Sequence, residues 1–448
     1  MISRHITNPD RRSPSGKGKH FTVFSASVYR LATVTIGAGY KYLYMGQRAQ
    51  TAFSDQVPPV TLQANRSETT MAPRLRDLIS GARALLGIIG KRWVLTGPRS
   101  VALAISDVCD TNCIMCWCHS PLVHREADLS DTRKIGMDSR RPRFMDTALF
   151  ETIIRESRAM GTFRVVLCGY GDPALHPHFD HMLELMGRLE MEPYVLTNGL
   201  SIDERRARLW AASRAHFRFS MHAGDVETWL RVHPSGTARQ FERVSRTIKS
   251  LVSAGTPSVS MLHVIHKANF RNVPAMIEHA RELGVKEILF RPVRANGELA
   301  QVVLDRDEEA DLRVDLQRCS KLAANWGIRT NLGEYLTNNL YIHSGLVKTW
   351  SVYRQIPCYL GWIYAEFDRE GAMTPCLNSK IVMGRVGEQR LRDMWLSPRY
   401  WAFRRDGRNL PQRNEPVTGC ECRACCMAKY NVNVYNLLHL KSLRYAEA

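Results

Sequence analysis

The chain has 448 residues, which is too long for one small domain and predicts two or three. Hydrophobic residues make up 44% of the sequence, a share that supports folded cores and excludes a chain disordered throughout. The formal net charge of +19 suits an acidic partner such as nucleic acid, membrane lipid or an acidic peptide, but it is equally typical of a basic surface that only keeps a protein soluble.

The amino-terminal region is rich in Ser, Gly, Pro and Arg, and we expect residues 1–70 to form a poorly ordered basic extension. Its composition is also typical of a transit peptide, with Asp10 the only acid among the first 54 residues. We prefer another interpretation, in which the gene start is assigned too early and an amphipathic helical leader over 71–98 opens at Met71. No segment reaches the roughly 20 uninterrupted apolar residues of a membrane span, so no transmembrane segment is predicted.

Strand-like runs alternate with helical patterns between residues 99 and 325. This alternation predicts an α/β protein with a parallel sheet and helices outside it. The pattern alone does not separate an open doubly wound sheet from a partial barrel, but both place reactive groups in loops at the carboxyl ends of the strands. The predicted strands are 101–107, 163–168, 193–198, 217–221, 258–265 and 287–293, and the predicted helices are 147–160, 178–189, 203–213, 241–252, 273–284 and 308–325.

The last part of the chain has a different character. A helical connector is expected over 301–350, and residues 351–448 combine irregular stretches with several cysteines. The run at 362–376 predicts a hairpin that turns at Asp368–Gly371. We therefore predict a second, smaller α+β domain that is rich in cysteine.

The twelve cysteines are clustered rather than spread along the chain. None occurs before Cys109, four lie within CDTNCIMCWC (109–118), and four lie within CECRACC (420–426). Tight clusters in a long chain indicate metal ligation in a reducing compartment rather than a framework of disulfides. We therefore expect a cytoplasmic protein.

The first cluster contains a CxxxCxxC motif, made of Cys109, Cys113 and Cys116, directly after the first predicted strand. Three thiolates on one loop can hold a cubane of four irons and leave one iron without a protein ligand. We interpret Cys118 as a bystander, because a fourth thiolate would close that open position. A zinc knuckle is the alternative, but the preceding strand and the glycine-rich loop after the next strand argue against it.

A CxxxCxxC motif in the first β/α loop of such a chain resembles the radical S-adenosylmethionine (radical SAM) superfamily, and the resemblance covers about residues 99–300. It implies a partial (βα)6 parallel barrel. It also implies a [4Fe–4S] cluster whose open iron binds S-adenosylmethionine. In the family, reduction of this cluster yields a 5′-deoxyadenosyl radical, which takes hydrogen from an unactivated carbon.

The same resemblance implies residues that bind SAM. GYGDPALHP (169–177) is similar to the family's glycine-rich stretch, in which glycine lets the backbone approach a ligand without a Cβ clash. Ser220 ends the fourth strand, near the family's ribose contact, and Arg231 matches the arginine that pairs with the SAM carboxylate. The sequence departs from the family at Met115, where an aromatic residue is common, and at Asp172, where glutamate is usual. The implied set is Gly169, Tyr170, Gly171, Asp172, Ser220 and Arg231.

The second group of cysteines resembles the SPASM and twitch extensions of radical SAM enzymes. Two cysteines flank the predicted hairpin and a CxxC pair follows in the tail, and four thiolates can close a [4Fe–4S] cluster fully. We predict one auxiliary cluster, with Cys420 or Cys426 as substitute ligands. A zinc ribbon is the alternative. The predicted ligands are Cys358, Cys376, Cys422 and Cys425.

Together these motifs predict a radical SAM enzyme that abstracts hydrogen from a carbon of a peptide or small metabolite and then oxidises or rearranges the radical. An electron donor such as flavodoxin or ferredoxin is implied. The sequence identifies neither the substrate nor a catalytic acid or base. The rival hypothesis is an iron–sulfur or zinc protein that binds nucleic acid or a protein partner without SAM chemistry. Only the basic amino-terminal region favours it, and we do not expect a nucleic-acid partner.

Two smaller features keep two interpretations each. His263 and His266, on and just after the fifth strand, either line the barrel interior near SAM or substrate or are satisfied core residues. The charged stretch at 124–143 is either a lid or substrate-binding insertion or a solvated loop.

Overall fold

The computed structural model describes residues 71–91, 93–123, 144–256, 258–293, 297–337 and 349–440. By its internal contacts the chain divides into two units, Met1–Ala64 and Asn65–Ala448, and all the described residues belong to the second. The predicted basic extension at 1–70 and the charged stretch at 124–143 lie outside the described residues.

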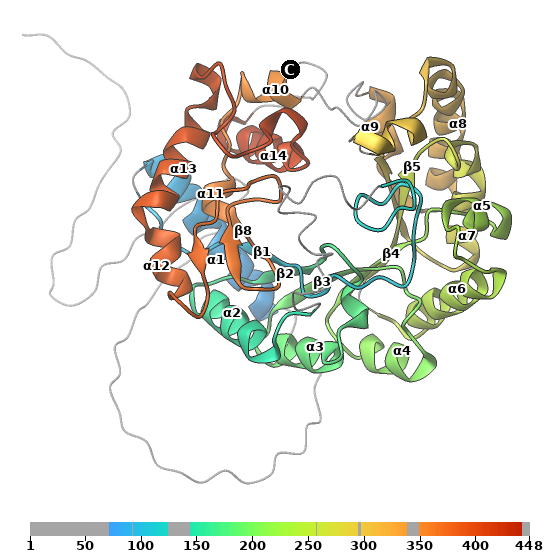
Figure 1. Ribbon diagram of the computed structural model, residues 1–448, viewed down its shortest axis with the longest axis horizontal. Helices are drawn as coiled ribbons and strands as arrows, with labels where there is room; N and C mark the ends of the chain where they lie inside the picture. The colour runs from blue at the N-terminus through green and yellow to red at the C-terminus, as the bar shows by residue number, and fades with distance from the viewer. Residues whose placement is uncertain are drawn as a thin grey trace, which may run out of the picture. The chain divides into compact units, whose positions relative to one another are not determined.

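One ten-stranded sheet runs through the described part of the chain, with the strand order β10-β9-β8-β1-β2-β3-β4-β5-β6-β7 (Figure 1). Neighbouring strands from β8 through β7 are parallel, whereas β9 and β10 are antiparallel to their neighbours. The strands are β1 Ser100–Leu103, β2 Arg164–Leu167, β3 Glu192–Thr197, β4 His216–Ser220, β5 Ser258–Ile265, β6 Glu287–Pro292, β7 Arg329–Thr330, β8 Tyr364–Phe367, β9 Ala372–Thr374 and β10 Gly384–Arg385.

Helices follow these strands and cover the outer side of the sheet, as α2, α3, α4 and α6 show in Figure 1. Each helix buries an apolar stripe, and α6 buries Phe241, Val244 and Ile248 in this way. The predicted β/α alternation is confirmed, because hydrophobic period and caps are local signals; the Asp146 carboxylate, for example, accepts from Leu149 N at 3.0 Å. The helices are α2 Thr147–Ala159, α3 Phe179–Arg188, α4 Glu204–Ala211, α5 Val226–Val232, α6 Ala238–Ser253, α7 Val273–Glu282 and α8 Arg306–Asn325.

The structure differs from the predicted elements at two places in the core. The first strand ends at Leu103 instead of reaching residue 107, and the Ile105 carbonyl then accepts from Met145 N at 2.9 Å, outside the sheet. Helix α5 was not predicted. Its seven residues are too few to display a clear helical period, although Asp225 caps it by accepting from Thr228 N at 2.8 Å.

The leader predicted over 71–98 is helical over α1, Met71–Gly90, and the described residues 93–98 are not helical. Its Ile88 side chain is buried and forms an apolar cluster with Tyr359 and Trp362, which precede β8. Other apolar side chains of α1 face solvent, and Leu78 is 69% exposed. None of the helices in the described ranges combines the length and the apolar character that spanning a bilayer requires.

The predicted hairpin at 362–376 is confirmed as β8 and β9, which pair antiparallel. The Asp368 carboxylate shapes its turn by accepting from Glu370 N at 3.0 Å and Ala372 N at 2.8 Å, and Gly371 adopts the left-handed conformation with φ of 80°. The remaining helices are α9 Leu332–Thr337, α10 Thr349–Tyr353, α11 Leu360–Ile363, α12 Leu391–Leu396, α13 Pro398–Arg408 and α14 Ala428–His439.

The hairpin is also part of the core sheet. Strand β8 pairs parallel with β1, so that Ser100 lies opposite Tyr364 and Leu103 lies opposite Phe367. The carboxyl ends of both strands therefore lie at the same edge of the sheet, which brings the loop after β1 and the hairpin turn together.

Candidate functional site

The loop after β1 carries the three cysteines of the CxxxCxxC motif. The Thr111 hydroxyl lies between two of them, 3.3 Å from Cys109 Sγ and 3.5 Å from Cys113 Sγ. The middle of the loop is anchored to the end of α5, because Ile114 N donates to Val232 O at 3.0 Å. The loop therefore presents its thiols from a backbone that α5 anchors between Cys113 and Cys116.

Cys116 is the thiol that the surrounding groups prepare for ionisation. Its Sγ accepts from Cys118 N at 3.4 Å and from His119 N at 3.3 Å. The Cys118 thiol and these two N–H groups outweigh burial and lower the pKa of Cys116 to about 7. Burial raises the pKa of Cys109 to about 11 and that of Cys113 to about 12, so these two thiols need the positive charge of a metal to become thiolates.

Cys118 lies next to the motif and is only 5% exposed. Burial raises its pKa well above the usual range, which keeps it a neutral thiol that donates to Cys116. Its predicted status as a bystander stays a prediction, and these contacts agree with a donor rather than with a fourth ligand.

The donor chemistry of the loop fits an iron–sulfur cubane. Three thiols stand on one loop, and backbone N–H groups point at one of the sulfurs, as iron–sulfur sites require to stabilise sulfur charge. Among the described residues, no three or more His, Cys, Asp or Glu side chains converge closely enough to hold one metal ion. A cubane instead offers each cysteine a different iron, so its ligands need not meet at one point.

The glycine-rich loop after β2 lies directly on the segment that leads to Cys109. Gly171 N donates to Ser106 O at 2.9 Å, and a Cβ on Gly171 would stand 2.3 Å from Val108 O. A Cβ on Gly169 would stand 2.6 Å from Ala104 Cβ, at a φ of 149° that disfavours other residues. We expected these glycines to admit a ligand; the close approach that the structure requires of them is to this backbone.

Asp172 joins the glycine-rich loop to the end of β3. Its buried carboxylate accepts from Ala174 N at 2.9 Å, from Thr197 Oγ1 at 2.9 and 3.0 Å, and from Asn198 N at 2.6 Å. Burial raises its pKa to about 6 despite these bonds. In this arrangement its oxygens are occupied by internal donors, so its predicted contact with SAM stays a prediction.

Asn198 extends this network to the cysteine loop. Its Nδ2 donates to Asp110 Oδ1 at 2.6 Å and lies 3.8 Å from Cys109 Sγ. Asn198 is the last residue of the strand predicted at 193–198, and it is not among the predicted site residues. A polar residue at the carboxyl end of a parallel strand was the signal that could have marked Asn198 as a site residue.

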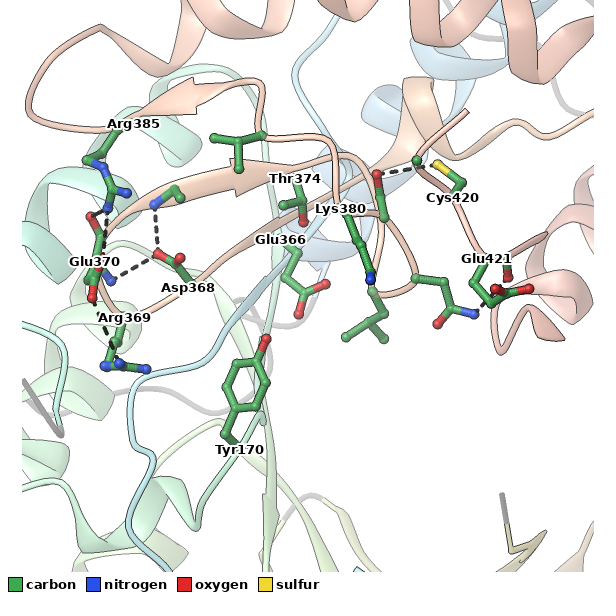
Figure 2. A pocket seen from close by; sticks show the side chains of 16 residues that line it. Tyr170, Glu366, Asp368, Arg369, Glu370, Thr374, Lys380, Arg385, Cys420 and Glu421 are labelled. Atoms are coloured by element: carbon green, nitrogen blue, oxygen red, sulfur yellow. Dashed lines mark hydrogen bonds and ion pairs between the residues drawn. The ribbon is translucent and has the colours of Figure 1, made fainter. Parts of the chain in front are cut away.

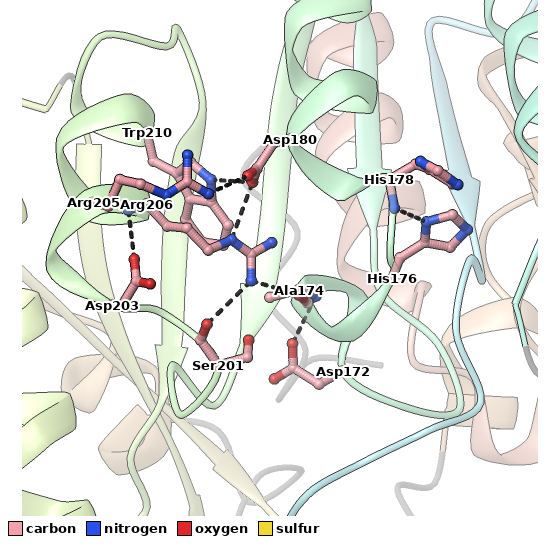
Figure 3. A network of polar contacts seen from close by, with 10 residues as sticks. All are labelled: Asp172, Ala174, His176, His178, Asp180, Ser201, Asp203, Arg205, Arg206 and Trp210. Carbon is pink, nitrogen blue, oxygen red and sulfur yellow. Dashed lines mark hydrogen bonds and ion pairs between the residues drawn. The ribbon is translucent and has the colours of Figure 1, made fainter.

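A second polar network supports the glycine-rich loop from α4 (Figure 3). The Arg206 guanidinium donates to Ala174 O and Ser201 O, both at 3.1 Å, and to Asp180 Oδ1 at 3.1 Å. Trp210 Nε1 donates to the same Asp180 oxygen at 3.0 Å. These bonds fix the backbone on which Asp172 stands.

The remaining predicted SAM-binding residues, Tyr170, Ser220 and Arg231, lie on three different parts of the fold. Tyr170 stands beside the cysteine loop, with its ring 5.3 Å from that of Trp117 in an edge-on contact. Ser220 is half-buried at the end of β4. Arg231, on α5, donates to Glu227 at 2.6 Å and to Thr228 at 2.9 Å, so its guanidinium is engaged within its own helix and its SAM contact stays a prediction.

Four buried histidines gather near the carboxyl ends of β4 and β5: His222, His233, His263 and His266. Burial lowers the pKa of all four, to about 3 for His263 and His266, so they are neutral at pH 7. Neither ring nitrogen of His263 has a hydrogen-bond partner among the described residues. This favours an interior polar group over a satisfied core histidine.

The second group of cysteines lines one small internal cavity. All four predicted ligands border it, and Cys420 does so too. Cys376 and Cys420 share a hydrogen bond, whereas exposed Cys426 points its thiol at Asn378 Oδ1, 3.3 Å away. The structure thus brings the predicted ligands together, keeps Cys420 as a substitute and turns Cys426 elsewhere. The predicted ligands are Cys358, Cys376, Cys422 and Cys425.

A larger cavity of about 450 Å³ reaches from the glycine-rich loop to this second group of cysteines (Figure 2). Tyr170 lines one end of it and Cys420 the other. Figure 2 shows the Lys380 and Glu366 side chains extending into the cavity from the same side, with Tyr170 facing them. The Glu366 carboxyl is the unusual group here, because its Oε2 is buried without a hydrogen-bond partner in the described residues and burial, followed by nearby Asp368, raises its pKa to about 8. Glu366 is therefore mostly protonated at pH 7.

A buried ion pair closes the edge where β1 and β8 end. The Arg369 guanidinium, in the hairpin turn, contacts the Asp107 carboxylate two residues before Cys109, and their side chains are 5% and 1% exposed. It therefore ties the cysteine loop to the C-terminal segment. Sequence reasoning missed this pair and Glu366, since neither belongs to a recognisable motif.

Comparison with known proteins places these two regions in known families. The model of the Radical SAM superfamily matches residues 103–280, and the SPASM model, an iron–sulfur cluster-binding domain, matches residues 358–427. The PqqA peptide cyclase of Methylobacterium sp. (strain 4-46) is 24% identical over 300 residues, which cover 63% of this chain and 75% of that protein.

Solved structures share the fold. Streptococcus suis SuiB bound to precursor peptide SuiA aligns over 86% of this chain and 83% of its own, with a TM-score of 0.51 and 16% identity. Native anSMEcpe with bound AdoMet and Cp18Cys peptide aligns over 77% and 99%, with a TM-score of 0.51 and 13% identity. These likenesses confirm the predicted partial parallel barrel.

The radical SAM match implies a [4Fe–4S] cluster and S-adenosylmethionine as cofactors, and the SPASM match implies auxiliary iron–sulfur clusters. Both matches fall on the regions in which the structure gathers the predicted cysteine ligands. The chain is a member of the radical SAM superfamily with a C-terminal SPASM domain.

Proposed function

We propose that the protein is an enzyme that cleaves S-adenosylmethionine reductively and abstracts hydrogen from a carbon of a peptide substrate. The observation that carries the proposal is the 450 Å³ cavity that extends from Tyr170, in the glycine-rich loop, to Cys420, beside the predicted auxiliary ligands, because it offers a space for a substrate next to both regions. Cys109, Cys113 and Cys116 would hold the first cluster. Bound there with SAM, that cluster supplies the 5′-deoxyadenosyl radical of this superfamily.

The chain's own residues have defined tasks in this proposal. Asn198 and Thr111 hydrogen-bond the cysteine loop and stabilise negative charge on its sulfurs. Gly169, Tyr170, Gly171 and Asp172 support the loop's backbone, and the implied SAM contacts of this stretch, with Ser220 and Arg231, remain part of the proposal. Cys118 donates to Cys116 and leaves the open iron free.

A peptide is the proposed substrate class. The relatives named above include a peptide cyclase and two structures with bound peptides. The cavity is lined by both charges, including Lys380 and Arg385 as cations, which suits a polar polypeptide segment. Burial raises the pKa of Glu366 to about 8, close to neutral pH. The carboxyl is therefore positioned to exchange a proton with a bound residue.

The auxiliary site completes the proposal. Four cysteines, Cys358, Cys376, Cys422 and Cys425, would close one [4Fe–4S] cluster that accepts the electron left on an oxidised substrate. A small electron-transfer protein such as flavodoxin or ferredoxin would reduce the first cluster. We place the enzyme in the cytoplasm, since tight clusters of cysteines that ligate metal are typical of a reducing compartment.

The test is anaerobic reconstitution followed by reduction with dithionite in the presence of SAM. We expect about eight irons per chain and formation of 5′-deoxyadenosine. Cys113→Ala should lose about four irons and all 5′-deoxyadenosine, whereas Cys319→Ala, at a buried cysteine on α8, should lose neither. A fully loaded wild-type protein that forms no 5′-deoxyadenosine contradicts the proposal and favours a binding protein without SAM chemistry.

A further inference from the structure

A buried tyrosine hydrogen-bonds one of the predicted auxiliary ligands. Tyr353 ends α10 and is 1% exposed, and its hydroxyl donates to Cys425 Sγ at 3.1 Å. The two residues are 72 positions apart in the chain, so tertiary packing brings them together. A buried tyrosine needs a partner for its hydroxyl, and here the partner is a sulfur rather than a backbone carbonyl.

Asn431 fixes the direction of that hydrogen bond. This residue lies on α14, is fully buried, and its Oδ1 accepts from Tyr359 N at 2.6 Å. A backbone N–H can only donate, so the amide oxygen of Asn431 must face Tyr359 and the amide nitrogen must face the other way.

The Asn431 Nδ2 group then donates to the Tyr353 hydroxyl at 2.9 Å. An amide NH₂ cannot accept, so the single phenolic hydrogen of Tyr353 is left for Cys425. The bond to the phenol oxygen also polarises the O–H group and makes it a stronger donor to sulfur. Asn431 contacts Cys358 as well, which places the network beside two of the four predicted ligands.

We propose that Tyr353 and Asn431 are positioning residues that hydrogen-bond the auxiliary cluster through Cys425 and raise its reduction potential. The inference rests on the proposed auxiliary cluster. A reduced cluster carries one more negative charge, so a donor that points at its sulfur stabilises the reduced state more than the oxidised state. A raised potential makes the cluster a better acceptor for the electron that leaves the substrate.

The test is a potentiometric titration of the auxiliary cluster, followed by electron paramagnetic resonance. It uses the full chain and the Cys109→Ala/Cys113→Ala/Cys116→Ala background, in which only the auxiliary cluster gives a signal. For Tyr353→Phe we expect the reduced-to-oxidised ratio at a fixed ambient potential to fall about tenfold, which is about 59 mV for a one-electron couple. The matched control is Tyr400→Phe, since the Tyr400 hydroxyl is equally buried but donates to Tyr364 O.

A second variant allows the inference to be tested even if Tyr353→Phe does not retain the auxiliary cluster. Replacement of Tyr353 by 3-fluorotyrosine keeps the ring and makes the hydroxyl a stronger donor, so the potential should rise. Wild-type protein in D₂O should also show an exchangeable deuteron coupled to the reduced auxiliary cluster, and Tyr353→Phe should lose that signal.

The outcomes separate this inference from the proposed function. A Tyr353→Phe protein that keeps about four irons in the triple-alanine background and shows an unchanged potential overturns the inference and leaves the SAM chemistry standing. An equal shift in Tyr400→Phe also overturns it, because the effect then comes from general packing. A wild-type chain that holds only about four irons removes the auxiliary cluster and the inference with it.

Discussion

Glu366 provides a test of the 450 Å³ cavity that needs no knowledge of the substrate. The perturbation is Glu366→Gln, which keeps the shape of the side chain and removes its ability to ionise. In the wild type the carboxyl is buried, and Asp368 is the charged neighbour that raises its pKa further. Lys380, which follows β9, lines the same cavity. Cys168, Tyr170 and Tyr364 are other titratable groups that sense its charge, from the end of β2, the glycine-rich loop and β8.

The sign of the effect follows from the raised pKa. The folded protein binds the Glu366 proton up to about pH 8, whereas the unfolded chain releases it near pH 4.5. The wild type therefore loses stability as pH rises from about 4.5 to about 8, and the loss is constant above that range. A neutral glutamine has no such loss. The stability of the variant relative to the wild type therefore increases over the same pH range.

The stabilisation expected for Glu366→Gln has an upper bound. A pKa that moves from 4.5 to about 8 corresponds to about 5 kcal/mol, at 1.36 kcal/mol per unit. Water that enters the cavity screens the carboxylate, so we expect the variant to be more stable by about 1–3 kcal/mol at pH 9. This corresponds to a rise in Tm of about 2–6 °C for a chain of this size.

The assay is anaerobic thermal unfolding at pH 6 and pH 9, at one scan rate, because cluster proteins rarely unfold reversibly. The gain in Tm should be larger at pH 9 than at pH 6. Glu388→Gln is the control, since that side chain is 69% exposed and should show no pH-dependent difference. A Glu366→Gln protein that is less stable than wild type at pH 9, or whose gain ignores pH, refutes the reasoning.

Three further predictions concern the contacts that hold the site. Arg369→Met leaves Asp107 buried without its cation and should lower the free energy of unfolding by about 3–5 kcal/mol in a urea titration, with partial recovery when Asp107→Asn is added. Gly169→Ala should destabilise by about 1–3 kcal/mol and lower the iron content, whereas Gly187→Ala, whose Cβ meets no atom within 4 Å on α3, should stabilise by about 0.5–1 kcal/mol. Asn198→Ala removes the donor near Cys109 and should slow iron loading of the first cluster while the auxiliary cluster loads normally; equal loading of both contradicts its role.

The helices, strands and cysteine motifs of this chain could be predicted from the sequence because they depend on residues that are close together in the chain. The β/α alternation depends on hydrophobic period and caps, and the structure confirms it between β1 and α8. The CxxxCxxC motif places three thiols on one short loop, so the sequence predicts a [4Fe–4S] cluster with one iron left open. The predicted hairpin also followed from its turn residues, Asp368 and Gly371.

Other features depend on partners that are distant in the chain. The reason for Gly171 is the backbone of Val108, and nothing near position 171 in the sequence reveals that neighbour. The sequence also did not reveal that Thr197 and Asn198 donate hydrogen bonds to the Asp172 carboxylate, which was predicted to bind SAM. A sequence pattern reports which residue types are present, but it does not report which donors reach them.

The amino-acid sequence alone indicated the family of this protein, through the resemblance carried by its CxxxCxxC motif, and the order of its helices and strands. Only tertiary packing paired β8 with β1, joined Arg369 to Asp107, buried Glu366 without a partner and aimed Tyr353 at Cys425. The physical reason is range. Cysteine spacing and hydrophobic period act over a few residues, whereas burial, desolvation and hydrogen-bond direction are set by side chains that meet only when the whole chain has folded.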